Sequence, residues 1–390
     1  MKTDNNRRNF IKRSLSAAAG LAAATIPEGY GAIKDSNRPK EYFSDPQRAY
    51  SQSPSIRFSA IGLNHGHIYS QVEAVIRGGG QLVAFYAKEK ELTDPFGKRF
   101  PQAKLVTSEK EILEDNSIKL IVSASIPVDR APLGIQAMKH GKDFMVDKPG
   151  ITTLDQLAEV RRVQKETKRI YSIMYSERFE NRATVKAGEL VKAGAIGQVI
   201  QTIGLGPHRI NLASRPAWFL EKSMYGGIIC DIGSHQFDQF LFFTGSQQAE
   251  VVCSQVGNVH YPQYPQFEDF GDVTVKGNGG TGYVRVDWFT PDGLNTWGDG
   301  RLTILGTDGY IEIRKNVDIA GHPGGNHLFL VDNKETRYMD CGQEPLPYGE
   351  QLVNDILNRT EIAMSQEHCF LATELALKAQ NQAQKLILKK

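Results

Sequence analysis

Short apolar runs and segments of helical spacing alternate through residues 56 to 174, and this alternation limits the possible folds more than any other feature. Strands are predicted at 56–61, 81–86, 119–124, 143–146 and 169–174, with helices between them at 71–76, 109–115, 131–140 and 154–167. Alternation of this kind predicts a doubly wound parallel sheet with helices on both faces. Ligands of such sheets bind at the carboxyl ends of the strands.

The turn after the first predicted strand has the position, but not the full composition, of a dinucleotide-binding loop. Such a loop has the pattern G-x-G-x-x-G and places the pyrophosphate at the N-terminus of the next helix. Here the segment is Gly62-Leu-Asn-His-Gly-His67, so Asn64 and His67 replace the second and third glycines. Asn tolerates left-handed backbone angles, which keeps the turn possible. We expect the His67 side chain to crowd the contact between helix and strand.

Two further segments follow the carboxyl ends of predicted strands. Ala87 and Lys88 follow the second strand, with Glu89 one step later, where NAD-binding domains carry an acid for the ribose. Lys88 could instead meet the 2′-phosphate of NADP, so the cofactor is predicted as NAD or NADP. The turn Asp147-Lys148-Pro149 follows a later strand. Proline restricts the backbone there, and Lys148 would direct an ammonium group into the crevice.

Alternating apolar and polar residues dominate the second half of the chain. After a helix at 183–192, strands are predicted at 198–203, 250–255, 272–276, 282–289, 301–305 and 310–314, and a last helix at 369–388. This pattern predicts one mainly antiparallel sheet with one covered face and one open face. The predicted fold class is therefore α/β followed by α+β.

Residues 225–245 contain a glycine pair followed by an apolar segment that carries Asp231, His235 and Asp238. On a helix, spacings of four and three put these side chains on one face. A carboxylate one turn before an imidazole can orient the ring for proton transfer to or from an alcohol. A buried helix whose polar residues cap neighbouring backbone is the alternative explanation of this pattern alone.

The N-terminus is predicted to be a processing segment. A twin arginine, Arg7-Arg8, precedes a short Ala-rich apolar region, which is typical of a twin-arginine signal peptide of a protein exported folded to the periplasm. The predicted divisions are a signal at 1–30, a linker at 31–53, a nucleotide-binding domain at 54–176 and a substrate domain at 177–390.

Charge and cysteine usage exclude several classes of partner. Residues 1–24 carry five Lys/Arg and one Asp, so removing them changes the formal net charge from +2 to −2. The rest of the chain is nearly neutral, which argues against nucleic acid or an anionic membrane as a partner. The four cysteines are widely spaced and form no metal-binding pattern.

These segments resemble the family of glucose–fructose oxidoreductase, inositol dehydrogenase and the rhizopine-catabolism oxidoreductases (Gfo/Idh/MocA), from about Ile56 to the C-terminus. The matching segments are Ile61-Gly62, 141–149, 193–197, 215–218, 226–238, 306–309 and the last helix. The family usually has Glu-Lys-Pro where this chain has Asp147-Lys148-Pro149. It also commonly carries Thr-Pro followed by a His, whereas here Ser125-Ile-Pro127 is followed by Asp129-Arg130. These departures indicate a divergent branch.

The resemblance implies a Rossmann domain, an open-faced sheet that forms the substrate pocket, and a homo-oligomer. It implies a catalytic role for Lys148, Asp231 and His235. Residues assigned to the nucleotide are Gly62, Asn64, His65, His67, Lys88, Ser125, Pro127, Asp147, Lys148 and Pro149. Arg178, His208, Arg209 and Trp218 are candidate sugar contacts, each with a surface or packing role as the alternative.

Three functions remain open from the sequence. The first is transfer of a hydride between a tightly bound nicotinamide and a secondary hydroxyl of a sugar, glycoside or cyclitol, with His235 as base oriented by Asp231. The second is a redox-neutral cleavage of a glycoside through a 3-keto intermediate on the same retained cofactor. The third is a carbohydrate-binding protein without cofactor. A metal held by His65, His67, His208 and His235 is a minor alternative because these residues lie far apart in the sequence, and no metal is predicted.

Overall fold

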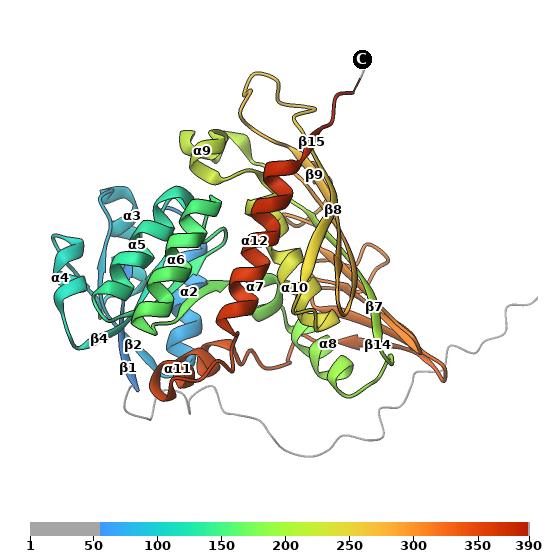
Figure 1. Cartoon of the computed structure of the whole chain (residues 1–390), viewed down its shortest axis with the longest axis horizontal. Helices are drawn as coiled ribbons and strands as arrows, with labels where there is room; N and C mark the ends of the chain where they lie inside the picture. Colours follow the sequence, from blue (N-terminus) through green and yellow to red (C-terminus); the bar gives the residue numbers. More distant parts are fainter. Residues whose placement is uncertain (1–54, 389–390) are drawn as a thin grey trace, which may run out of the picture. The chain divides into compact units, whose positions relative to one another are not determined.

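Six parallel strands form the N-terminal sheet, sheet A, of the computed structural model, which describes residues 55–388. The predicted signal and linker lie outside the described residues. The strand order is β3-β2-β1-β4-β5-β6 (Figure 1), which is the order of a dinucleotide-binding fold and confirms the predicted class. The strands are β1 (Ile56–Ile61), β2 (Gly80–Tyr86), β3 (Lys104–Leu105), β4 (Ile118–Ser123), β5 (Asp143–Asp147) and β6 (Tyr171–Met174).

The strands of sheet A are apolar because helices cover both faces. In β1 and β4 every residue except the second is buried. The helices are α2 (His67–Arg77), α3 (Lys90–Arg99), α4 (Glu109–Glu114), α5 (Pro127–Lys139) and α6 (Leu154–Thr167). The Thr153 hydroxyl accepts a hydrogen bond from the Gln156 backbone N–H and so caps the start of α6.

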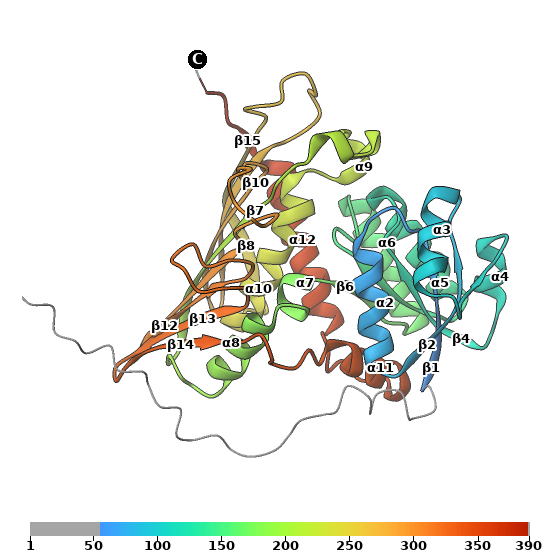
Figure 2. The same cartoon turned by 180° about the vertical axis from the view of Figure 1, so that it is seen from behind.

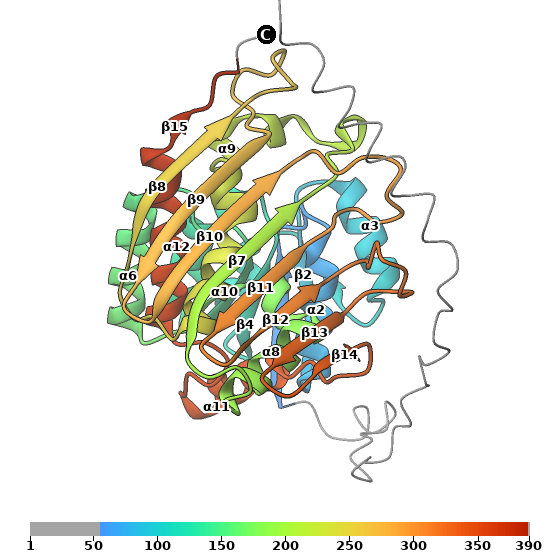
Figure 3. The ribbon, with the colours of Figure 1, turned by 90° about the vertical axis from the view of Figure 1, so that its right-hand side faces the viewer.

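Nine strands form the second sheet, sheet B, in the order β14-β13-β12-β11-β7-β10-β9-β8-β15. Their pairing is antiparallel except for β10 with β7 and β15 with β8, which run parallel. Figure 3 shows the sheet from its open side, with its helices behind it. The strands are β7 (Val199–Pro207), β8 (Ala249–Gly257), β9 (Phe270–Gly277), β10 (Gly280–Asp287), β11 (Arg301–Gly306), β12 (Gly309–Arg314), β13 (His327–Asp332), β14 (Thr336–Asp340) and β15 (Gln384–Lys385).

The remaining helices follow β6, connect β7 to β8, or connect β14 to β15. They are α7 (Ser176–Phe179), α8 (Arg182–Lys192), α9 (Lys222–Tyr225), α10 (Ser234–Thr244), α11 (Tyr348–Asn358) and α12 (Gln366–Gln382). Helix α12 packs against β8 of sheet B and against α6 and β6 of sheet A, as the two opposite views show (Figures 1 and 2). Because α12 joins the two sheets, one hydrophobic core runs through both. No helix among residues 55–388 is long and apolar enough to span a membrane.

Candidate active site

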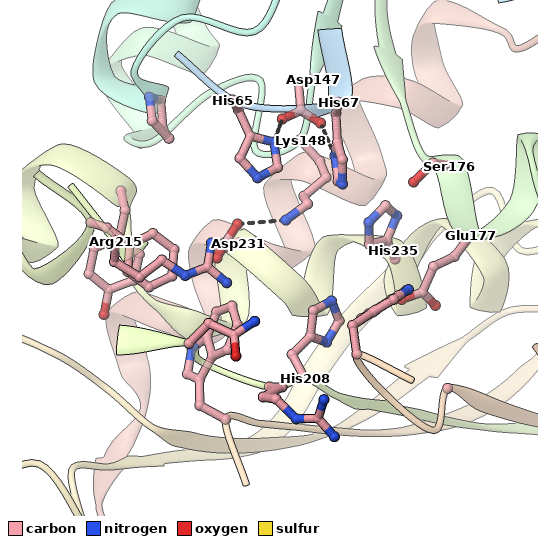
Figure 4. Close-up of a pocket in the computed structure, with 18 of the residues that line it drawn as sticks. His65, His67, Asp147, Lys148, Ser176, Glu177, His208, Arg215, Asp231 and His235 are labelled. Carbon is pink, nitrogen blue, oxygen red and sulfur yellow. Dashed lines mark hydrogen bonds and ion pairs between the residues drawn. The ribbon is translucent and has the colours of Figure 1, made fainter. Parts of the chain in front are cut away.

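A cavity of about 420 Å³ lies at the carboxyl ends of the sheet A strands (Figure 4). One wall consists of residues that follow β1, β4, β5 and β6, and the opposite wall consists of residues from sheet B. The segment that leads into α10 closes the cavity between them. The cavity is where the alternating pattern places a ligand.

Lys148 and Asp231 form a buried ion pair in this cavity. Lys148 follows β5, and its Nζ donates to Asp231 Oδ1 at 2.7 Å. The two residues are only 6% and 7% exposed. Burial alone would raise the pKa of Asp231, but the Lys148 ammonium and its hydrogen bond hold that pKa below the ordinary value. The pair therefore fixes an ammonium group inside the cavity.

His235 lines the same cavity but is not oriented by Asp231, which corrects the sequence prediction. Asp231 belongs to a single π-helical turn, η4 (Ile229–Gly233), and His235 to the α-helix that follows it. The wider π turn changes the spacing from which a shared α-helical face was predicted. Asp231 pairs with Lys148 instead, and the buried Nδ1 of His235 has no hydrogen-bond partner among the described residues.

Desolvation keeps His235 neutral. Burial lowers the pKa of its imidazole to about 3, and although Glu177 opposes this, Lys148 and Lys315 lower it further. A neutral imidazole has one free lone pair, so it can accept a hydrogen bond or a proton from a hydroxyl group.

Glu177 organises a polar network on the side of the cavity beside His235. Its carboxylate accepts hydrogen bonds from Lys315 Nζ at 2.5 Å and Gln236 Nε2 at 2.8 Å. Burial would raise the pKa of Glu177, but Lys315 and the nearby imidazoles bring it to about 2. Sequence reasoning missed both Glu177 and Lys315. The only available signal was the position of Glu177 directly after the last strand of sheet A.

Arg178 does not line the cavity, contrary to its assignment as a sugar contact. Its guanidinium donates two hydrogen bonds of 2.7 Å to Asp238, and both residues are buried. His368 Nε2 approaches the same carboxylate at 2.8 Å. The spacing of Asp231, His235 and Asp238 suggested three polar residues on one catalytic face. Asp238 instead forms a structural ion pair with Arg178, and neither of these two residues lines the cavity.

His65 and His67 converge on Asp147 at the opposite wall (Figure 4). His67 Nδ1 lies 2.9 Å from Asp147 Oδ1 in a hydrogen bond, and His65 Nδ1 lies 2.8 Å from Oδ2 without hydrogen-bond alignment. His67 therefore turns into the cavity and does not crowd the helix–strand contact, so that expectation was wrong. Burial and the neighbouring His67 lower the pKa of His65 to about 4, despite the attraction of Asp147.

These three residues are the one group within residues 55–388 whose ligand types and spacing could hold a metal, since their donor atoms lie within 4.8 Å of one another. Arg130 argues against it. This buried guanidinium donates to Asp147 Oδ2 at 3.1 Å, so its positive charge lies where it would oppose a divalent cation. His208 and His235, named with them from the sequence, are not part of the group.

The glycine turn keeps the backbone geometry of a nucleotide loop. Gly62 has φ +77°, and a Cβ there would lie 2.5 Å from Ser125 Cβ. Only glycine fits such a position. Asn64 Nδ2 donates to Glu89 Oε1 at 3.2 Å, which places this acid over the turn. Glu89, and not the residue at 87, thus stands where the ribose acid is expected. The residues present therefore fit a dinucleotide on this side of the cavity.

The other residues assigned to the nucleotide divide into two groups. Pro127 lines the cavity together with His65, His67, Asp147 and Lys148. Lys88 is exposed beyond β2, and Ser125 is buried beneath Gly62. Pro149 follows a cis peptide bond after Lys148.

Three of the four predicted sugar contacts, His208, Arg209 and Trp218, line the cavity. Burial lowers the pKa of His208 to about 4, so its imidazole is neutral as well. Sequence reasoning missed Arg215, Trp288 and Trp297, which complete this aromatic and cationic wall.

Two family models match the chain. Residues 56–175 match an oxidoreductase family with an NAD-binding Rossmann fold, and residues 184–312 match the GFO/IDH/MocA C-terminal domain. The chain belongs to the GFO/IDH/MocA family. It is therefore an oxidoreductase with an NAD-binding Rossmann fold, which confirms the resemblance and sets aside the cofactor-free binding protein.

Individual GFO/IDH/MocA proteins are similar over much of the chain. A scyllo-inositol 2-dehydrogenase (NAD(+)) of Bacillus subtilis is 27% identical over 297 residues, 73% of this chain and 82% of that protein. A myo-inositol 2-dehydrogenase of Thermotoga maritima is 30% identical over 211 residues, 52% of this chain and 56% of that protein. The crystal structure of a proposed oxidoreductase from Erwinia carotovora atroseptica SCRI1043 is 47% identical with a TM-score of 0.83, and the match covers 85% of this chain and 100% of that one.

Proposed function

We propose that this protein transfers a hydride between a nicotinamide cofactor and a secondary hydroxyl of a sugar, glycoside or cyclitol. The observation that carries the proposal is the buried Lys148–Asp231 pair, which shares one cavity with the neutral imidazole of His235. The similarity to two inositol dehydrogenases supports an alcohol of this class. The neutral and cationic donors of the opposite wall suit the many hydroxyl groups of a polyol.

Lys148 polarises the reacting oxygen in this mechanism. Its ammonium hydrogen-bonds the hydroxyl, and the developing negative charge on that oxygen is stabilised in a cavity where water is scarce. Asp231 holds the ammonium in place through the 2.7 Å hydrogen bond. His235 accepts the hydroxyl proton, for which its neutral state is required. Oxidation removes that proton and the hydrogen of the carbinol carbon with its electron pair, and it leaves a ketone.

The nicotinamide, when bound, accepts that hydrogen and its electron pair. The turn at Gly62 and the N-terminus of α2 would hold the pyrophosphate. Glu89 would bind the ribose hydroxyls, which favours NAD over NADP, because a 2′-phosphate would meet its negative charge. Pro127 and the His65–His67 pair face the side of the cavity where the nicotinamide would lie.

We also propose export of the folded protein to the periplasm with its cofactor tightly bound, motivated by the twin arginine at Arg7-Arg8. A retained cofactor would suit a redox-neutral cleavage of a glycoside as well as a net oxidation. Cell fractionation of the protein and of a variant with both arginines replaced by lysine tests the export. Equal amounts of both proteins in the periplasm would overturn it.

The proposed chemistry is tested on purified protein in two steps. Denaturation should release NAD(H) or NADP(H), identified by absorbance and mass. Incubation with glycosides and inositols should then produce a keto-sugar, or cleaved sugar if the cycle is redox-neutral. Protein that neither contains nor binds a nicotinamide nucleotide, and forms neither product, contradicts the proposal.

Substitutions assign the individual roles. Lys148→Ala and His235→Ala are each expected to lower turnover by about 10²-fold or more while nucleotide content stays unchanged. His140→Ala, at an exposed histidine outside the cavity, is the control and should keep full activity. Near-normal turnover in either cavity variant rejects the role assigned to that residue.

A further inference from the structure

A second cavity of about 670 Å³ adjoins the one that holds Lys148. The two cavities share Arg209, Asn211 and Trp288 as lining residues, so they are direct neighbours. The second cavity lies beyond the carboxyl ends of β7 and β10, and it includes Tyr261 and Thr290. Its distance from the nucleotide turn leaves it without a role in the function proposed above.

Two buried polar atoms of this second cavity have no partner among the described residues. Trp288 is 4% exposed, and its Nε1 donates to no acceptor. Thr290 is 8% exposed, and its hydroxyl has neither donor nor acceptor. A buried polar group without a partner is destabilising, so such groups are uncommon unless a ligand or water satisfies them. Two of them two positions apart, both in residues that line this cavity, indicate a site built for hydrogen bonds.

The remaining walls of the second cavity are aromatic or amphipathic. Phe289 is 41% exposed between Trp288 and Thr290, and Tyr261 approaches from the loop after β8. Arg209 and Asp292 add a cation and an exposed carboxylate, 3.5 Å apart, at the rim. Opposite charges at this distance offset one another, so neither an anionic nor a cationic ligand is favoured. Exposed aromatic faces beside unpaired N–H and O–H groups suit a neutral ring that carries C–H faces and hydroxyls.

We propose that this second cavity binds the second sugar ring of a glycoside whose first ring is oxidised beside Lys148. The inference rests on the function proposed above and narrows its substrate class from free sugars and cyclitols to disaccharides and related glycosides. One ring would lie against Lys148 and His235, and the glycosidic oxygen would lie beside Asn211 and Trp288, which line both cavities. Hydroxyls of the second ring would accept from Trp288 Nε1 and donate to Thr290 Oγ1.

Equilibrium binding tests the site without depending on turnover. Methyl α- and β-glucosides are compared with maltose and cellobiose by calorimetry on the nucleotide-containing protein. At least one disaccharide should bind about 10-fold more tightly than the matching methyl glycoside, because one or two hydrogen bonds and an aromatic contact are gained. Thr290→Val should weaken only the disaccharide, by about 5-fold, and Phe289→Ala should do the same.

Thr303→Val is the matched control, because this threonine lies on β11 and lines neither cavity. It should change neither affinity. Equal affinities for disaccharides and methyl glycosides, or equal losses for both ligand types in Thr290→Val and Phe289→Ala, overturn the second-ring site. If the disaccharides bind as expected but no keto-sugar or cleavage product forms from any of the four compounds, the site stands and the proposed reaction fails.

Discussion

Three histidines stand around the candidate active site, His235 buried and His65 and His208 half-buried, and each is held in its neutral form. Burial is the largest cause in all three, and it brings the pKa of His65 and His208 to about 4 and that of His235 to about 3. Lys148 lowers each of these values further, since a second positive charge nearby is unfavourable. The cavity therefore offers neutral imidazoles beside the ammonium groups of Lys148 and Lys315.

These depressed pKa values predict how stability depends on pH. The unfolded chain takes up protons on its histidines near their ordinary value of 6.5, whereas the folded chain does so only near 4 or below. The unfolded state therefore binds more protons below about pH 6.5, and the free energy of unfolding falls as the pH drops from 6.5 towards 4. Urea unfolding between pH 7.5 and 5 measures this, in a window above the titration of Glu177.

The slope of the unfolding free energy against pH gives the number of protons taken up on unfolding. His235→Asn should lower that number by about one, while His140→Asn, at an exposed site, should leave it unchanged. A free energy of unfolding that stays constant from pH 7.5 to 5 would show that these histidines are not held neutral by the fold.

The sequence predicted which residues line the active site better than it predicted which residues each of them contacts. The family resemblance predicted that Lys148, Asp231 and His235 share one site, and the structure does bring them into one cavity. The predicted contact between Asp231 and His235 failed because a single π-helical turn separates them, and sequence spacing gives no sign of such a turn. Lys315 could not be found at all, because its link to Glu177 joins residues 138 positions apart.

The turn between β1 and α2 is the element on which nucleotide binding depends. Its two glycines differ in their surroundings. Gly62 has a left-handed backbone and lies against Ser125, while Gly66 has ordinary helical angles, and a Cβ there would meet nothing within 4 Å. The two positions therefore provide a matched pair of substitutions within one loop.

Gly62→Ala is expected to cost at least about 1 to 2 kcal/mol of stability through its backbone angles alone, with a further cost from the clash with Ser125. It should also lower the nucleotide content of the purified protein, because the turn must shift. Gly66→Ala should change the stability by less than about 1 kcal/mol. Thermal unfolding with quantification of released nucleotide measures both, and equal behaviour of the two variants would contradict the importance of the Gly62 turn.

Helices and strands with a clear apolar pattern were predicted well. Strands that are recognised only by their pairing with strands far away in the sequence were not. The strands of sheet A appeared as apolar runs because both faces are buried. Strands β13 and β14 were missed, and β14 consists almost wholly of exposed residues, so no apolar pattern distinguishes it. The parallel pairing of β10 with β7 was also missed, because local turn signals indicate only antiparallel neighbours.

At the scale of the whole molecule, α12 connects the nucleotide-binding and substrate-binding halves. Gln366, at its start, accepts a hydrogen bond from the Tyr171 backbone in sheet A, and Gln380, near its end, accepts one from the Ile229 backbone in η4. The helix thus ties the start of β6 to the turn that carries Asp231. The sequence predicted this helix but placed it at 369–388. The spacing of its apolar residues gave no sign that it would contact both sheets. The domain boundary predicted at residue 176 stays a prediction.

The open face of sheet B leads to the last prediction, which concerns assembly. On this face Leu305 and Tyr310 lie opposite each other on β11 and β12, and Ile200 lies on the neighbouring strand β7; each is 40% exposed or more. The alternate residues Ile304 and Ile311 point to the helix-bearing side and are fully buried. An apolar patch on a flat sheet that no helix among the described residues covers is expected to contact a second copy of the chain.

Leu305→Glu should therefore lower the oligomeric state, because it buries a carboxylate in that contact at a cost of several kcal/mol. Light scattering coupled to size-exclusion chromatography measures the mass of wild type and variant across a range of concentrations. Leu105→Glu, at a similarly exposed leucine on the edge strand β3 of sheet A, is the control and should leave the mass unchanged. A wild-type protein that is monomeric at all concentrations, or a Leu305→Glu variant of unchanged mass, would show that the open face does not hold the copies together.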